Sequence, residues 1–182
     1  MKVVLATPLY PPEIAEPAPY MKELAKRLAK LHEVTIVAYA RLPEKIPGVS
    51  IITIDKRQPL PIRLFAFLRA LWQATRCVDV VYAENGASVE LPSGIIARLG
   101  RRPLIMHLGD RAAHKRAHKN SFLRNIEHFA LSRAARVITD MPIARPEILP
   151  LEPYPAEAFA AYEESWSTHL RALEDAFNYA VS

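Results

Sequence analysis

Residues 1–40 read MKVVLATPLYPPEIAEPAPYMKELAKRLAKLHEVTIVAYA and contain the pattern that decides the fold. An apolar run with β-branched residues at 3–6 predicts a buried parallel strand. Five prolines then make residues 8–19 a stiff loop with few free amides. Apolar residues at helical spacing from Met21 to Leu31 predict an amphipathic helix, and a second strand follows at 34–38. The stretch is therefore predicted to form a strand–helix–strand unit.

The same alternation continues along the chain. Further strands are predicted at 49–54, 78–83, 103–108 and 137–139. One helix is predicted to begin with Pro59 and Pro61, another to run over 89–99, and a basic helical stretch to cover 112–134. Short strands that alternate with helices imply a parallel sheet covered on both faces. We predict an α/β fold with one Rossmann-like, doubly wound parallel sheet of about six strands, over residues 1–140.

The last part of the chain has a different composition. Residues 141–157 contain five prolines and no glycine, which predicts an extended, semi-rigid spacer. Residues 158–182 place six apolar side chains, from Phe159 to Phe177, at helical spacing. A helix with such an apolar stripe needs a partner surface, so we expect it to pack back on the domain.

Composition favours a cytoplasmic protein. No apolar run approaches the roughly 18 residues that span a bilayer, and the first residues lack the pattern of a signal peptide. The single cysteine, Cys77, cannot form an internal disulfide, which fits a reducing compartment. We expect Cys77 to be a small buried residue at the end of a helix.

Charge is distributed unevenly. Residues 98–136 contain ten Lys or Arg against two acids, whereas residues 152–182 contain six acids and one Arg. A basic patch of this kind predicts an anionic partner, and an anionic membrane surface fits it, with peripheral attachment at the inner face. Alternatively, the acidic end of the chain docks beside the basic segment. Nucleic acid is not expected, because Phe122 and Phe129 are the only aromatic residues in the segment and no binding module is recognisable.

The loop after the first strand argues against a dinucleotide cofactor. A dinucleotide site there needs G-x-G-x-x-G, so that backbone amides can approach the pyrophosphate. Here the loop reads TPLYPPEIAEPAP and has no glycine, and no G-x-x-x-x-G-K-[ST] sequence occurs anywhere. We therefore expect no NAD, FAD or other cofactor.

Several segments resemble family 4 glycosyltransferases, enzymes with two Rossmann-like domains that face across a cleft (the GT-B fold). The resemblance is carried by PPEI at 11–14, DVVYAENGASVELP at 79–92, Gly109-Asp110, and YEESWSTHLRALEDAF at 162–177. It covers nearly the whole chain in two blocks, and it implies an N-terminal acceptor domain followed by the helix that crosses back at the end of those enzymes. The donor-binding domain between them is expected to be missing. The resemblance further implies a retaining, metal-independent reaction with a nucleotide-sugar donor as substrate.

Two departures from the family concern the donor. Ala15 and Glu16 stand where the family usually has paired glycines, and a carboxylate there would repel a diphosphate. The family's Glu-x7-Glu element, which grips the nucleotide sugar, is absent from this sequence. Both departures argue against donor turnover by this chain alone.

The resemblance assigns candidate site residues at the carboxyl ends of the strands. His107 and Asp110 would face the acceptor as catalytic residues, since an imidazole titrates near neutral pH. The implied substrate-binding residues are Tyr10, Glu13, Asn85, Ser88, Gly109 and Arg111. His114 and His118 lie one helical turn apart, but no third ligand stands at an obvious spacing, so no metal site is predicted.

Three functions remain open on the sequence alone. The chain can be a split subunit whose donor half is another polypeptide, or a compact enzyme that holds the donor in another way. It can also be a non-catalytic relative that binds a carbohydrate, lipid or protein. An exposed surface that faces the cleft is expected to bind a partner, either a donor-domain protein or a second copy of the chain in a homodimer.

Overall fold

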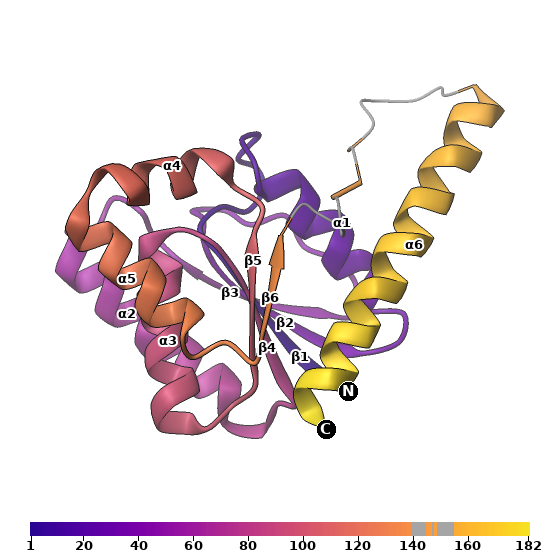
Figure 1. The fold of residues 1–182 in the computed structure, drawn as a ribbon. Coiled ribbons are helices and arrows are strands. Elements are labelled where there is room, and N and C mark those ends of the chain that lie inside the picture. Colours follow the sequence, from indigo (N-terminus) through magenta and orange to yellow (C-terminus); the bar gives the residue numbers. More distant parts are fainter. Residues whose placement is uncertain (140–144, 147, 149–154) are drawn as a thin grey trace.

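The computed structural model describes residues 1–139, 145–146, 148 and 155–182, and Figure 1 shows its ribbon. The described residues form one sheet of six parallel strands in the order β3-β2-β1-β4-β5-β6. The strands are β1 (Lys2–Thr7), β2 (Glu33–Tyr39), β3 (Val49–Ile54), β4 (Val80–Glu84), β5 (Leu104–Leu108) and β6 (Arg136–Thr139). This order is that of the doubly wound Rossmann sheet, with its switch point between β1 and β4. The predicted fold class is confirmed.

Helices cover both faces of the sheet. They are α1 (Ala18–Leu28), α2 (Leu60–Ala74), η1 (Thr75–Cys77, a 3-10 turn), α3 (Ala87–Gly100), α4 (Arg111–Lys119), α5 (Ser121–Leu131) and α6 (Ala156–Val181). In Figure 1, α1 and α6 lie on one side of the sheet, and α2, α3 and α5 lie on the other. Successive side chains of β1 point to opposite faces of the sheet. Val3 and Leu5 therefore belong to one hydrophobic core, and Val4 and Ala6 belong to the other.

The C-terminal helix α6 packs back on the domain, as its apolar stripe predicts. Trp166 is fully buried and stacks on Tyr20 of α1, with ring centroids 5.8 Å apart. The guanidinium of Arg27 lies 4.9 Å from the Trp166 ring and pairs with both carboxylate oxygens of Glu163, at 2.9 and 2.5 Å. Phe159, at the start of the stripe, is 47% exposed. The helix therefore contacts the domain from its second turn onward.

Two acids of α6 pair with residues of α1 and of the turn that follows it. Glu163 pairs with Arg27, and Glu174 lies 2.5 Å from His32 in the turn after α1. Neither partner belongs to residues 98–136. These two acids therefore do not neutralise the basic segment, although α6 does reach its last residue, where the Arg136 guanidinium lies 5.2 Å from the Tyr179 ring.

The basic stretch predicted as one helix over 112–134 is two helices. Asn120 has an extended backbone and ends α4, and its side chain accepts hydrogen bonds from the amides of Phe122 and Leu123 at the start of α5. An asparagine that caps the second helix in this way competes with a continuous helix. The prediction overlooked this cap.

Two smaller predictions are corrected. Leu31 was expected on the apolar face of the first helix, but α1 ends at Leu28 and Leu31 is 76% exposed in the turn that follows. Cys77 was expected to be buried, but it is exposed at the end of η1, and the next residue, Val78, takes the buried position. The predicted spacer 141–157 lies largely outside the described residues. No helix in the described part of the chain is long and apolar enough to cross a membrane.

Candidate functional site

The carboxyl ends of β4 and β5 place two ionisable side chains together. Glu84 and His107 are register partners in the sheet, and both side chains are fully buried. Glu84 Oε1 lies 3.0 Å from His107 Nδ1. Because alternate residues of a strand share a face, Tyr82 points to the same side, and its hydroxyl lies 2.6 Å from His107 Nδ1 and donates to Glu84 Oε1 at 3.1 Å. Open α/β sheets bind ligands at this edge.

Arg145, from the proline-rich segment, contacts both members of the Glu84–His107 pair. Its guanidinium forms an ion pair with Glu84 and lies 4.5 Å from the centre of the Tyr20 ring. It also lies 3.5 Å from the carboxylate of Glu16 in the loop after β1. Gly109 makes room for it, since a side-chain carbon at Gly109 would collide with the Arg145 guanidinium.

The ion pair keeps its charges although it is buried. Burial alone would raise the pKa of Glu84, but Arg145 and His107, together with the hydrogen bonds, lower it below its ordinary value. Burial alone would lower the pKa of Arg145, but Glu84 raises it above its ordinary value. Burial and the nearby Glu84 charge raise the pKa of Tyr20 and Tyr82, so both phenols stay protonated at neutral pH.

A chain of hydrogen bonds links this cluster to α6. The hydroxyl of Tyr20 lies 3.1 Å from the hydroxyl of Tyr82 and 2.8 Å from Nε2 of His169. The cluster therefore lies between the sheet and the crossed-over helix, and α6 supplies part of its wall. We call Tyr20, Tyr82, Glu84, His107, Arg145 and His169 the edge cluster.

His107 is the predicted catalytic residue that lies within the edge cluster. Its Nε2 is buried and has no hydrogen-bond partner among the described residues. A buried polar atom without a partner is costly, and such atoms often mark a ligand position. The imidazole lies at the predicted sheet edge, but beneath Arg145 rather than open to solvent.

Asp110 and Asn85 are hydrogen-bonded to each other. The Asn85 side chain donates to the Asp110 carbonyl and accepts from the Asp110 amide, both at 2.8 Å. The Asp110 carboxylate accepts from the amides of Ala112 and Ala113 and so caps α4. These contacts join the loops that follow β4 and β5, and they occupy the polar atoms of Asn85.

The other predicted residues are spread around the same end of the sheet. Tyr10 is buried, its hydroxyl donates to the carbonyl of Glu44 at 3.1 Å, and burial followed by the Glu44 charge raises its pKa to about 12. Glu13 is exposed and lies 3.3 Å from Lys56. Ser88 is half-buried, and its carbonyl accepts from Tyr39. Arg111 is exposed as the first residue of α4. Two of the predicted substrate-binding residues lie beside His107: Gly109 contacts the Arg145 guanidinium, and the backbone amide of Asn85 donates to the carbonyl of His107 at 3.0 Å.

The prediction missed most of the edge cluster. One sequence pattern could have indicated Tyr82 and Glu84. A carboxylate two residues after a tyrosine in an apolar strand implies a buried polar pair. Arg145 carried no such signal, since its contact with Glu84 spans 61 residues and its proline-rich surroundings indicate only a spacer.

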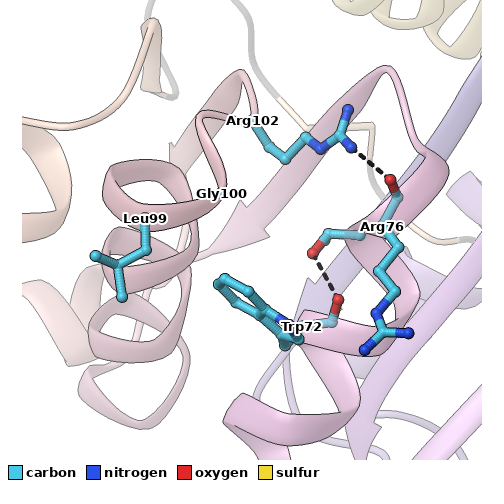
Figure 2. Close-up of a pocket in the computed structure, with 6 residues that line it drawn as sticks. Trp72, Arg76, Leu99, Gly100 and Arg102 are labelled. Carbon is cyan, nitrogen blue, oxygen red and sulfur yellow. Dashed lines mark hydrogen bonds between the residues drawn. The ribbon is translucent and has the colours of Figure 1, made fainter.

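A separate pocket of about 410 Å³ opens at the opposite edge of the sheet. Figure 2 shows Trp72 and Arg76 on one side, Leu99 and Gly100 on the other, and Arg102 reaching the carbonyl of Arg76. These residues precede β4 and β5, so the pocket lies at the amino ends of the strands. Buried ionisable groups favour the edge cluster over this pocket as the functional site.

Comparisons with known proteins agree with the topology. Two crystal structures of HepE (Alr3699) from Anabaena superpose on the chain. The complex with UDP gives a TM-score of 0.54 at 20% identity, covering 79% of this chain and 39% of HepE. The complex with UDP-glucose gives a TM-score of 0.53 at 19% identity, covering 75% of this chain and 37% of HepE. The chain thus spans about two fifths of HepE, and at this identity the likeness shows the fold.

The sequence itself identifies the family. No curated protein is significantly similar to the chain. The profile of the Glycosyl transferase 4-like domain, however, matches residues 16–158, which include α1, the edge cluster residues up to Arg145 and the spacer. The chain belongs to the glycosyl transferase 4-like domain family.

Proposed function

We propose that this chain is the acceptor-binding half of a nucleotide-sugar-dependent glycosyltransferase. Family membership supplies the reaction class. The observation that carries the proposal is the buried Glu84–His107–Arg145 group at the carboxyl end of β4 and β5, beside the switch point of the sheet. Buried ionisable groups at the carboxyl ends of parallel strands are typical of functional sites.

His107 would hold the acceptor hydroxyl. When Nδ1 of His107 carries its proton toward Glu84, Nε2 keeps a lone pair and can accept a hydrogen bond from a sugar hydroxyl. Glu84 would then act by orienting the ring. Arg145 contacts both Glu84 and, at 3.4 Å, Nδ1 of His107, and its N–H groups would suit an oxygen-rich or anionic acceptor.

The donor would be held by another polypeptide. Glu16 stands in the loop after β1 and its carboxylate faces the same edge through its contact with Arg145. A carboxylate at that point repels a diphosphate. We therefore favour a split enzyme, in which a donor-domain protein completes the cleft, over a compact enzyme or a homodimer.

Calorimetry separates these arrangements. UDP-glucose is the first donor to test, because HepE was crystallised with it, and GDP-mannose is the comparison. The split enzyme predicts no binding by the chain alone and saturable binding when a candidate donor-domain protein is present. Binding by the chain alone would indicate a compact enzyme. If no mixture binds a donor and none transfers sugar, the chain is a non-catalytic relative.

We also propose that the protein acts in the cytoplasm and attaches peripherally to anionic membrane. Helix α4 exposes Arg111, Lys115, Arg116 and Lys119, and Phe122, just beyond it, is 67% exposed. Basic side chains beside an exposed aromatic suit an anionic lipid surface. Co-sedimentation with phosphatidylserine vesicles should be strong at low salt and weaken as salt is added. Equal sedimentation with neutral vesicles would contradict this.

A further inference from the structure

Helices α4 and α5 bring three metal-ligating side chains together, apart from the edge cluster. His114 and His118 lie on α4 and Glu127 lies on α5, and one ligand atom from each falls within 4.8 Å of the others. Positions four apart share a helix face, so the two imidazoles are neighbours by geometry. Their Nε2 atoms are 3.1 Å apart, and their ring planes meet at 76°.

The separation of the two nitrogens suits one metal ion. Zinc–imidazole bonds of about 2.0–2.1 Å with a tetrahedral angle place two nitrogens roughly 3.3 Å apart. The observed 3.1 Å between His114 Nε2 and His118 Nε2 needs only a small rotation of one ring to match. At this distance the two nitrogens share a hydrogen bond, and a bound metal ion would take the place of the proton between them.

Glu127 sets the tautomer of His114. Its Oε1 lies 2.6 Å from His114 Nδ1, and the Glu127 side chain is only 5% exposed. When the Glu127 carboxylate accepts from Nδ1 of His114, Nε2 of the neutral ring keeps a lone pair. Metal-binding histidines commonly donate their second nitrogen to a carboxylate in this way, which fixes the ring and makes the ligand more basic.

We propose that His114 and His118 chelate a divalent transition-metal ion, with Zn²⁺ as the fitting ion and Glu127 as a positioning residue. Two imidazole ligands favour zinc, nickel or copper over magnesium or calcium. His114 is half-buried and His118 exposed, so water can reach the ion and complete its coordination. Lys115 and Arg116 flank the site on α4 and weaken its attraction for a cation.

The test is zinc titration by calorimetry on the full chain without a histidine tag. We expect one zinc per chain and no heat with Mg²⁺. His118→Ala removes an exposed ligand without disturbing the core and should weaken binding at least tenfold. Glu127→Gln should weaken it about 10- to 100-fold. His128→Ala is the matched control, because His128 is exposed on α5 and outside the cluster, and it should bind like the wild type.

Two further readouts distinguish chelation from a change in folding. Zinc should raise the melting temperature of the wild type and of His128→Ala, but not that of His118→Ala. With Cu²⁺, electron paramagnetic resonance should show hyperfine splitting from two nitrogens in the wild type and from one in His118→Ala. Absence of saturable zinc binding, or equal binding by His118→Ala, would overturn the site. Full affinity in folded Glu127→Gln would overturn the role of Glu127.

Discussion

Glu84, the last residue of β4, and His107, the last but one of β5, are partners in the sheet register. Oε1 of Glu84 lies 3.0 Å from Nδ1 of His107, and neither side chain is exposed. Arg145 completes the arrangement from a segment 61 residues along the chain. The sheet edge therefore holds a charged group whose stability depends on all three residues.

Removing the charge of Glu84 should destabilise the fold strongly. Glu84→Gln leaves the guanidinium of Arg145 largely buried without its carboxylate, which costs about 3–5 kcal/mol. Urea unfolding at pH 7 measures the change. Because the pKa of Glu84 is lowered, its contribution is present above the pKa of the unfolded carboxyl and is lost as pH falls through the lower folded pKa.

Glu16→Gln is the matched control, since Glu16 pairs with the same arginine but its side chain is 61% exposed. An exposed pair contributes about 0–1 kcal/mol. Equal losses for the two variants would show that Arg145 is not held by the buried carboxylate.

A methyl group at position 109 should displace Arg145. Gly109→Ala is expected to cost about 1–3 kcal/mol, because the new carbon collides with a guanidinium that the Glu84 pair holds in place. A double-mutant cycle with Arg145→Ala should show positive coupling, since the collision disappears with the guanidinium. Gly100→Ala serves as control, because a side-chain carbon there meets its nearest neighbour at an ordinary 3.7 Å. Additive effects of the 109 and 145 substitutions would be inconsistent with the contact.

Truncating the buried indole of α6 should weaken the whole domain. Trp166→Ala removes a fully buried side chain that stacks on Tyr20, with an expected cost of about 3–5 kcal/mol. Phe159→Ala, on the same helix but 47% exposed, should change stability far less. If chemical denaturation finds the two variants alike, α6 does not pack on the sheet through Trp166.

Titration of Glu90 is expected to lower the free energy of unfolding as pH rises. Burial, with a smaller contribution from Glu127, raises the pKa of Glu90 to about 7. The unfolded chain then loses its proton near the ordinary value of 4.5, while the folded chain keeps it to about pH 7. Between those values, stability falls with rising pH.

Glu90→Gln removes this titration and can still accept from the Gly86 amide, as Glu90 does at 3.0 Å. The variant should be more stable than the wild type at pH 8, by about 1–3 kcal/mol, and similar at pH 4.5. Thermal unfolding in the presence of a chelator makes the comparison free of metal binding. A gain of the same size at both pH values would mean that titration is not the cause.

The sheet could be predicted because its signals are local. Each strand is a short apolar run between turn residues, and the alternation with helices fixes a doubly wound sheet. The return of α6 was predictable from its apolar stripe, since Trp166 and Phe177 need a surface. The division at Asn120 was missed because one capping side chain outweighed a continuous helical composition.

The candidate site was predictable only in part. His107 and Gly109 were predicted because the resemblance points to the end of β5. Asn85 and Asp110 also lie there, but their hydrogen bonds to each other serve to join two loops. Arg145, Tyr20 and His169 reach the edge cluster from distant segments, and no local pattern indicates such contacts. Glu127 meets His114 only because the chain turns at Asn120.

The most direct measurement is binding of the labelled chain to an array of oligosaccharides and lipid-linked sugars, compared with that of folded His107→Gln. His128→Gln is the matched control, because His128 is exposed on α5 and does not belong to the edge cluster. If the edge cluster receives the acceptor, the wild type and the control retain the same subset of sugars and His107→Gln loses it. Retention of that subset by His107→Gln, or failure of the wild type to retain any sugar, would contradict an acceptor site at the ends of β4 and β5.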